Sequence, residues 1–560
     1  MDFRKWSERA FLVAFGLYFF IYAVLIPKGI YLRGDDFAYI ESVIQSLTQG
    51  RIVTHDFIGP YNAFFTFTGV MAYRLTGNFY LSTFGVLCIF AMINFFLFYC
   101  LFRVKLGEFS SAALTLLTVT FPFYLHKSVD YHGSLPTWTC FLTALLAFSM
   151  GRHLLLMIAI FLAVSTRQNS IVLFVLPVYS LVSGYRRKGR VQWALLFYLT
   201  LCLVALSIGK HFLQTNWFNR NLHVIPSDFN LALRILRQFG VGCFLSILFI
   251  TVASFAVMGK QSLEPFKKNL RQAILPLGLS LLFLGLAFGS SAALVWFQTP
   301  LIGSLDHGGR LQWVLKIFIL VSIWFFDRQL LNWNAIWLLG LAYLGISSML
   351  GFFWDYYLAE IAILSLWIVL QSLPLNYLDW HSRSRLFNFA FVLIIFGHLG
   401  YAYLYKVQFD KQALVDVVFE RLERQGKIYP DQMTGATFGF LGFKVFDLIV
   451  LDYPTHGFDD FTCYIQGNGV ALESALPWQK RLVSSSDSQA KVLVTGTAKI
   501  GFIALPYRVV DHQNPEGRDI CHGEFKYDER TSTHSRPYPL DNAEWANFIN
   551  LARAKTRGAG

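Results

Sequence analysis

Long apolar segments recur along the first 405 residues and limit what this chain can fold into more than any other feature. A helix that crosses a bilayer needs about 20 mainly apolar residues. The segments that approach this length are 10–27, 79–102, 110–126, 135–150, 154–166, 170–184, 191–209, 239–258, 272–297, 311–326, 332–350, 356–372 and 386–404. This pattern predicts a polytopic α-helical membrane protein with about 13 transmembrane helices. Composition agrees, because only 14% of residues are charged against about 25% in soluble domains.

Basic residues gather in alternate connections between these segments. The clusters are Arg4, Lys5 and Arg9; Arg103 and Lys105; Arg152; Arg186, Arg187, Lys188 and Arg190; Lys260, Lys267, Lys268 and Arg271; Arg328; and Arg383 and Arg385. All fall on one side if residues 61–76 do not span the bilayer. The positive-inside rule then places the N-terminus in the cytoplasm and the C-terminus outside. The net charge of +13 is explained by these loops and by anionic head groups, so it does not indicate nucleic-acid binding.

The first outer loop, residues 28–78, contains an acidic pair just past the first span. Asp35 and Asp36 are followed by Phe37, Ile40, Val43, Ile44 and Leu47, which recur at helical spacing. This spacing predicts a short amphipathic helix along the membrane interface. Residues 61–76 are too short and too polar to span, and we interpret them as a second interfacial helix. Carboxylates at a membrane surface are costly to keep there without a function. The alternative is a solvated loop with an incidental acidic pair.

Further polar residues fall at the predicted outer ends of the spans. The run Ser165-Thr166-Arg167-Gln168-Asn169 is the clearest example, because it interrupts two half-length apolar segments. Polar groups at membrane depth normally line a cavity. The alternative for this run is an ordinary turn between short helices.

Beyond residue 405 the pattern changes to mixed polar and apolar sequence. The runs Val492 to Thr497 and Ile500 to Leu505 are typical of strands. Asp541 and Glu544 have the spacing of a capping box that would open a last amphipathic helix. We expect residues 1–405 to form the transmembrane domain and residues 406–560 to form a small α+β domain outside the membrane.

The chemistry suggested by these residues is transfer from a lipid-linked phosphate. The sequence contains no Gly-rich phosphate loop, no metal-ligand spacing and no Gly-x-Ser-x-Gly elbow. We therefore expect neither a metal nor another cofactor. A carboxylate can accept the proton of an attacking hydroxyl, and cations can hold a departing phosphate.

The order of a first span, an outer loop with an acidic pair and interfacial helices resembles the GT-C class of membrane glycosyltransferases. The stretch Gly34-Asp35-Asp36-Phe37 is similar to their first-loop acidic motif, with Asp36 where many members have Glu. The layout of about 13 spans and an outer C-terminal domain resembles the aminoarabinose lipid A transferases and, more distantly, the protein O-mannosyltransferases. Arg167 to Ile171 is similar to a run in the dolichol-linked α-1,2-glucosyltransferases. The resemblance covers the first 190 residues best.

This resemblance implies an inverting enzyme that uses a polyprenyl-phosphate sugar, with a loop carboxylate as the catalytic base. Carried over by position, the base is Asp35, with Asp36 as the alternative. The candidate residues for the donor phosphate are Arg167, Lys210, His211 and Arg310. The candidate sugar or acceptor contacts are His55, Asp56, Asp130, His132, Gln168, Asn169, Asp306, His307 and Asp355. For each candidate the alternative is an interfacial anchor or an ordinary loop residue.

The leading hypothesis is a transferase in the bacterial inner membrane that modifies lipopolysaccharide or another surface glycan, with a periplasmic C-terminal domain. Its partners would be the lipid-linked donor, a glycan or glycolipid acceptor and membrane lipids. A secondary transporter or flippase of lipid-linked saccharides is one alternative, and it predicts paired inverted repeats. An oligosaccharide ligase or polymerase is the other. Nothing in the sequence fixes the sugar or the acceptor.

Overall fold

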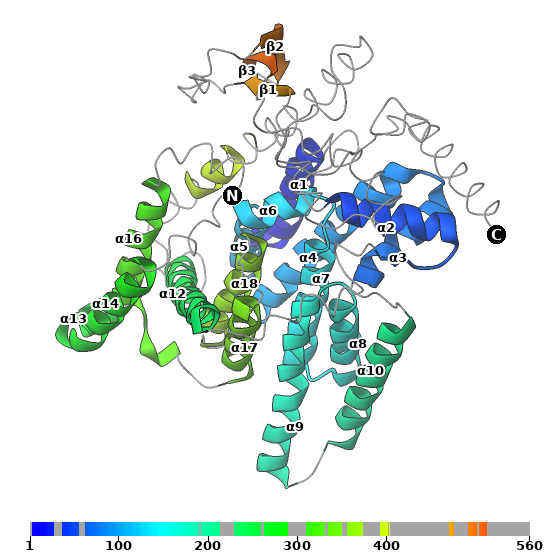
Figure 1. Ribbon diagram of the computed structural model, residues 1–560. Coiled ribbons are helices and arrows are strands. Elements are labelled where there is room, and N and C mark those ends of the chain that lie inside the picture. Colours follow the sequence, from blue (N-terminus) through cyan, green and yellow to red (C-terminus); the bar gives the residue numbers. More distant parts are fainter. Residues whose placement is uncertain are drawn as a thin grey trace.

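The computed structural model of the protein describes residues 3–26, 36–54, 62–189, 192–212, 229–258, 262–288, 310–330, 334–349, 355–372, 393–400, 403, 470–474, 491–500 and 503–511. The described part is mainly helical (Figure 1). The predicted C-terminal helix that would begin at Asp541 lies outside it.

Helices account for the apolar segments of the sequence. The first group comprises α1 (Phe3–Leu25), α2 (Asp36–Gln49), α3 (Ala63–Thr76), the π-helical turn η2 (Leu81–Gly85), α4 (Val86–Arg103), α5 (Glu108–Val119), α6 (Pro122–Val129), α7 (Ser134–Ser149), α8 (His153–Val164), the 3₁₀ helix η3 (Gln168–Phe174), α9 (Val175–Lys188) and α10 (Trp193–Phe212). The second comprises α12 (Phe229–Met258), α13 (Glu264–Arg271), α14 (Ile274–Phe288), α16 (Arg310–Phe325), η7 (Arg328–Leu330), α17 (Ala335–Met349) and α18 (Asp355–Ser372).

Two of these helices are long and apolar enough to cross a membrane unaided, at Leu81–Arg103 and Ile235–Phe255. A third span is possible if the bent pair α13 and α14 counts as one. Eight shorter apolar helices of 10–17 residues coincide with further predicted spans. Helices of this composition indicate association with a membrane.

The predicted span 110–126 is wrong as a single helix. The structure ends α5 at Val119 and begins α6 at Pro122. Proline has no amide hydrogen and its ring clashes with the preceding turn, so it is tolerated at the start of a helix and not inside one. The two predicted interfacial helices are confirmed as helices, α2 and α3.

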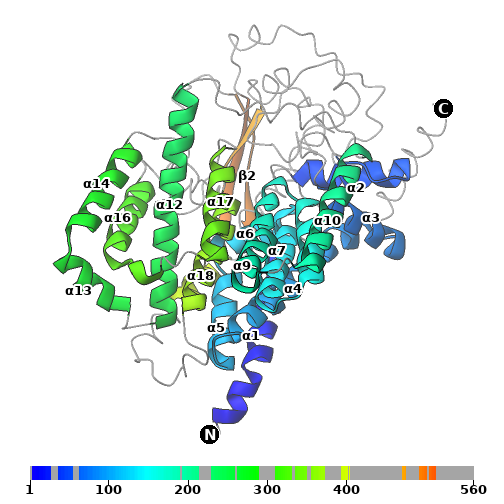
Figure 2. The ribbon, with the colours of Figure 1, turned by 90° about the horizontal axis from the view of Figure 1, so that it is seen from below.

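Helices α17 and α18 lie between α12 and the helices of the first group (Figure 2). Helix α17 contacts α9 and η3 on one side and α12 on the other. Helix α18 contacts α6 and packs along α12. The core is rich in large aromatic side chains, with Trp138, Tyr18 and Tyr131 fully buried. The contacts of α17 and α18 with the first group of helices bring the end of α8 close to the start of α18.

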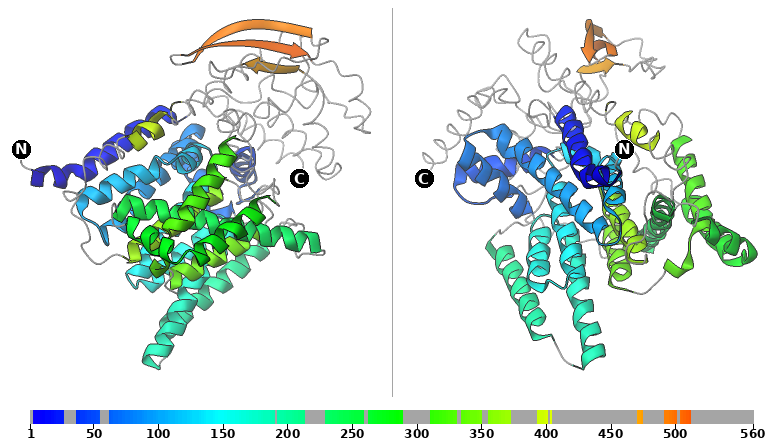
Figure 3. Two further views of the ribbon diagram at one scale, coloured as in Figure 1. Left: turned by 90° about the vertical axis from the view of Figure 1, so that its left-hand side faces the viewer. Right: turned by 180° about the vertical axis from the view of Figure 1, so that it is seen from behind.

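Three strands in the C-terminal region form an antiparallel sheet of order β1-β3-β2. They are β1 (Val470–Ser474), β2 (Lys491–Ile500) and β3 (Ile503–Asp511). Both views in Figure 3 draw them apart from the helices. The predicted run Val492 to Thr497 is confirmed as strand. The run Ile500 to Leu505 is not one strand, because β2 ends at Ile500 and its antiparallel partner β3 begins at Ile503.

Candidate functional site

Helices α2 and α3 are docked on one end of the bundle through α7 and α8. Tyr39 of α2 packs against the ring of His132 with 4.9 Å between ring centroids. The backbone amide of Phe64 in α3 donates to the carbonyl of Ser165 at 3.1 Å. A Cβ added at Gly69 would lie 2.8 Å from the Tyr131 hydroxyl, so glycine allows this close approach. The face of α2 predicted from its apolar spacing, including Ile40 and Val43, is buried here.

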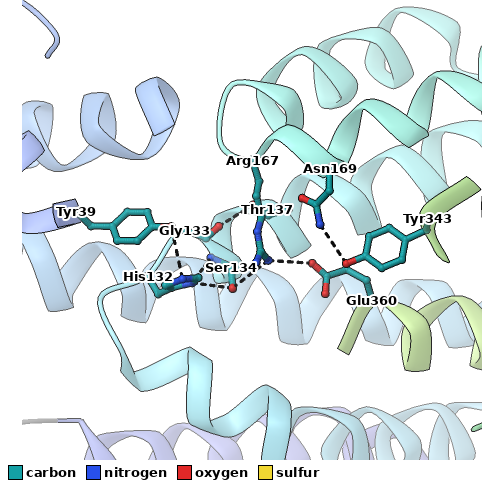
Figure 4. A network of polar contacts seen from close by, with 9 residues as sticks. All are labelled: Tyr39, His132, Gly133, Ser134, Thr137, Arg167, Asn169, Tyr343 and Glu360. Atoms are coloured by element: carbon teal, nitrogen blue, oxygen red, sulfur yellow. Dashed lines mark hydrogen bonds and ion pairs between the residues drawn. The ribbon is translucent and has the colours of Figure 1, made fainter. Parts of the chain in front are cut away.

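A chain of polar contacts runs from Tyr39 of α2 across the bundle to Glu360 of α18 (Figure 4). The Tyr39 hydroxyl lies 3.5 Å from His132 Nε2, and His132 Nδ1 lies 2.8 Å from Ser134 Oγ. Arg167 Nη1 donates to Ser134 Oγ at 3.3 Å and to Glu360 Oε1 at 3.3 Å. We call these five residues the Tyr39–Glu360 network. It joins α2, the start of α7, the end of α8 and the second turn of α18.

The donors around His132 define which ring nitrogen carries hydrogen when the imidazole is neutral. The backbone amide of Ser134 donates to Nδ1 at 3.2 Å, and an amide can only donate. Nδ1 is therefore the acceptor, and the hydrogen is on Nε2, facing the Tyr39 hydroxyl. The hydroxyl of Ser134 can then donate its hydrogen to Nδ1 while its oxygen accepts a hydrogen bond from Arg167. The network thus has one consistent direction of donation from Arg167 toward Tyr39.

The ion pair of Arg167 and Glu360 is the buried charge centre of the network. The side chain of Arg167 is 11% exposed and that of Glu360 is 1% exposed. Glu360 Oε2 makes no hydrogen bond of good geometry within the described residues, although the Trp138 indole and the Tyr343 hydroxyl lie beside this carboxyl. A buried carboxylate without its cation would be strongly unfavourable. The carboxylate of Glu360 and the guanidinium of Arg167 therefore neutralise each other inside the protein.

The polar run at 165–169 forms a break between α8 and η3, as the sequence predicted. Arg167 is extended at this break, with φ −156° and ψ 131°, and precedes η3. Asn169 Nδ2 donates to the Tyr343 hydroxyl of α17 at 3.2 Å, so the break is tied to α17 as well as to α18. Polar groups at a helix break near membrane depth need such partners inside the protein.

The Tyr39–Glu360 network lies at the ends of α7, α8 and α18. Helices α7 and α8 are packed neighbours joined by a short turn at 150–152, so the first residue of α7 and the last of α8 share an end. Arg167 reaches α18 in its second turn, at Glu360, whereas Asn169 reaches α17 near its middle, at Tyr343. The break, the start of α7 and the docked helices α2 and α3 therefore surround one polar region.

A second buried ion pair flanks this region. Lys127 Nζ lies 3.1 Å from Asp130 Oδ2, and the Asp130 side chain is 2% exposed. Tyr131 is fully buried, and burial raises the pKa of its hydroxyl, so it is neutral at physiological pH. Its ring packs on Phe65 of α3 with 4.6 Å between centroids. This pair and Tyr131 hold the connection between α6 and α7 in place beside the network.

The structure brings together five of the residues singled out in the sequence. They are Asp130, His132, Arg167, Gln168 and Asn169. Asp36, Lys210, His211, Arg310 and Asp355 have only their backbone positions described, at the start of α2, the end of α10, the start of α16 and the start of α18. Asp35, His55, Asp56, Asp306 and His307 lie outside the described residues.

Four residues in or beside the Tyr39–Glu360 network were not assigned a role from the sequence. Tyr39, Ser134 and Tyr343 are common residue types in apolar helices, and only their three-dimensional contacts distinguish them. Glu360 did carry a signal, because an acidic residue inside an apolar segment indicates a functional site. Its partner, Arg167, lies 193 positions away in sequence.

The described residues contain no group of three or more His, Cys, Asp or Glu side chains that could hold a metal ion. Comparison of the chain with protein-family models, with curated proteins and with solved structures found no match.

Proposed function

We propose that this protein is a membrane-embedded inverting glycosyltransferase that uses a polyprenyl-phosphate-linked sugar and acts at the head-group level of the bacterial inner membrane. The acceptor would be lipopolysaccharide or another surface glycan. The N-terminus would lie in the cytoplasm, and the C-terminal region in the periplasm.

The observation that carries this proposal is the position of α2 over the Tyr39–Glu360 network. Helix α2 begins at Asp36, three positions before Tyr39, which is about one helical turn. The backbone of Asp36 thus lies within about 5 Å, along the helix axis, of Tyr39, which contacts His132. Carboxylates and a polar network at one end of an apolar bundle are the combination that transfer from a lipid phosphate requires.

In this proposal Asp35 is the base that accepts the proton of the acceptor hydroxyl, with Asp36 as the alternative. The bond between the anomeric carbon and the donor phosphate oxygen breaks, and the acceptor oxygen bonds to the anomeric carbon on the opposite face. Polyprenyl phosphate leaves with the electron pair. His132 would hydrogen-bond a sugar hydroxyl or the phosphate through Nε2, with the substrate replacing the 3.5 Å contact to Tyr39. Because Glu360 compensates Arg167, the role of Arg167 would be shared between the donor phosphate and this internal pair, with Lys210, His211 and Arg310 as further phosphate candidates.

The experiment is incubation of the purified protein with labelled polyprenyl-phosphate sugars and a membrane-extract acceptor, with release of polyprenyl phosphate as the readout. Asp35→Asn is the test variant, and Arg152→Gln, at an exposed residue in the short turn between α7 and α8, is the matched control. Release that depends on Asp35 or Asp36 supports the proposal. No release with any polyprenyl-phosphate sugar would refute it.

A secondary transporter or flippase is the second candidate, because a buried ion pair between helices and a broken helix are both found in transporters. Reconstitution in liposomes separates the two functions. A transporter moves a fluorescent lipid-linked saccharide between leaflets without cleaving it, whereas a transferase consumes the donor and leaves its leaflet distribution unchanged.

A further inference from the structure

A short charged helix, α13, runs nearly perpendicular to the apolar helix that follows it. The axes of Glu264–Arg271 and Ile274–Leu286 differ by 95° across a short break. Helix α14 exposes large aliphatic side chains, with Ile274 90% exposed and Leu281 and Leu282 more than half exposed. A helix with this surface runs through hydrocarbon. Figure 2 shows α13 crossing the end of α14. If α14 crosses the hydrocarbon, α13 lies along the membrane plane.

The charged residues of α13 occupy one side of that helix. At about 100° per residue, Glu264, Lys267, Lys268 and Arg271 fall within an arc of roughly 100°. The remaining positions, Pro265, Phe266, Asn269 and Leu270, fall on the other side. All four charged side chains are exposed. The face therefore carries three cations and one anion.

The opposite side of α13 is fixed to the end of α16. Asn269 is buried, and its Nδ2 donates to the carbonyl of Trp324 at 2.9 Å and to that of Phe326 at 3.0 Å. These carbonyls belong to the last turn of α16 and the residue after it, which otherwise lack partners within a helix. The ring of Phe266 stacks on Phe325 with 4.7 Å between centroids. The charged face is therefore held in one orientation by the protein.

The ion pairing on this face is incomplete. Lys267 Nζ lies 2.9 Å from Glu264 Oε1, with both side chains about two-thirds exposed. Lys268 and Arg271 make no ion pair with any residue that the structure describes. A rigid helix in the interface plane with a net positive face is complementary to the phosphates of anionic lipids.

We propose that the charged face of α13 is a docking surface for the head groups of anionic phospholipids, with Lys268 and Arg271 contacting the lipid phosphate. Exposed Leu270 and Ile274 would lie against the acyl chains just below. This proposal is independent of the proposed transferase activity, because it concerns a different surface and a different molecule.

The test uses the full-length protein in detergent, with dioctanoyl phosphatidylglycerol and dioctanoyl phosphatidylcholine as probes and native mass spectrometry as the readout. Each Lys or Arg near an anionic surface contributes about 1 kcal/mol, which is about fivefold in affinity. We expect phosphatidylglycerol to bind more tightly than phosphatidylcholine. Lys268→Gln and Arg271→Gln should each weaken its binding about fivefold. Glu264→Gln should strengthen it, which loss of structure could not do.

The double variant Lys268→Gln with Arg271→Gln is compared with a matched control, Arg152→Gln with Arg186→Gln. The control removes two exposed cations from other parts of the chain and has the same total charge as the double α13 variant. The control should bind phosphatidylglycerol as the wild type does. Equal weakening by both double variants would show only a general charge effect and overturn the proposal. Equal affinity of the wild type for the two lipids, or no effect of the three α13 substitutions, would also overturn it.

Discussion

Separating the buried partners Arg167 and Glu360 should destabilise the protein in an asymmetric way. Removing one member of a buried ion pair typically costs about 3–5 kcal/mol, because the other charge stays buried. Glu360 is 1% exposed and Arg167 is 11% exposed, so Arg167→Gln leaves the more deeply buried charge behind. A lone carboxylate can take up a proton, whereas a guanidinium cannot lose one. The two single variants should therefore respond differently to pH.

The sign of the pH effect follows from the protons that each state binds. In Arg167→Gln the lone buried carboxyl of Glu360 favours its neutral, protonated form, so the folded protein binds a proton more readily than the unfolded chain does. The free energy of unfolding of this variant should then rise as the pH falls, by at most about 1.4 kcal/mol for each pH unit. The deficit relative to wild type should therefore be smaller at pH 5 than at pH 7. Glu360→Gln should show a deficit that is nearly constant over this range.

Chemical unfolding in mixed micelles at pH 5, 6 and 7 measures these differences. Each variant is compared with the wild type at the same pH, so that contributions common to all the proteins cancel to first order. The double variant Arg167→Gln with Glu360→Gln should recover most of the loss, because it leaves no lone charge. Single variants that cost less than about 1 kcal/mol at pH 7, or the same pH slope for both, would refute the assignment of a buried pair.

Three further predictions concern the acidic loop, a tight contact and the topology. Asp35→Asn should reduce transfer by at least about 10²-fold to 10⁴-fold with folding intact, as measured by release of polyprenyl phosphate, and Asp36→Asn should have the smaller effect if Asp35 is the base. Gly69→Ala should lower the free energy of unfolding by about 1–3 kcal/mol, because its Cβ would lie 2.8 Å from both the Tyr131 hydroxyl and Val43 Cγ2; an unchanged unfolding midpoint would contradict this contact. In a cysteine-free background, a cysteine at position 306 should react with an impermeant reagent in intact cells, whereas one at position 188 should not, and the reverse would refute the proposed orientation.

The local features of this fold could be predicted from sequence because each depends on residues close together in the chain. The spacing of Ile40, Val43 and Ile44 predicted the buried face of α2. The polar run around Arg167 predicted the break after α8. The split of α5 and α6 was missed because the apolar segment was judged by its length, although Pro122 identifies where a helix must begin anew.

The pairing within the site could not be predicted in the same way. Whether Arg167 faces lipid phosphate, solvent or a carboxylate depends on which helix lies opposite, and α18 lies far away in sequence. Glu360 was recognisable as a charged residue in an apolar segment, yet nothing local connects it to Arg167. The contact of Tyr39 with His132 likewise requires α2 to dock on the start of α7, which the spacing of apolar residues in α2 does not specify.

The location of the Tyr39–Glu360 network distinguishes between the two proposed functions. A transporter needs its polar site near the bilayer midplane, where both sides of the membrane can be reached in turn. Here Ser134 begins α7, Arg167 follows the end of α8, and Glu360 lies in the second turn of α18, so the network lies at helix ends. Docked over it are α2 and α3, whose buried contacts with Tyr131 and Ser165 would have to break for the region to open toward the midplane. A polar region at one end of the bundle and covered by helices suits a reaction at the level of the lipid phosphate, which is why we favour transfer over transport.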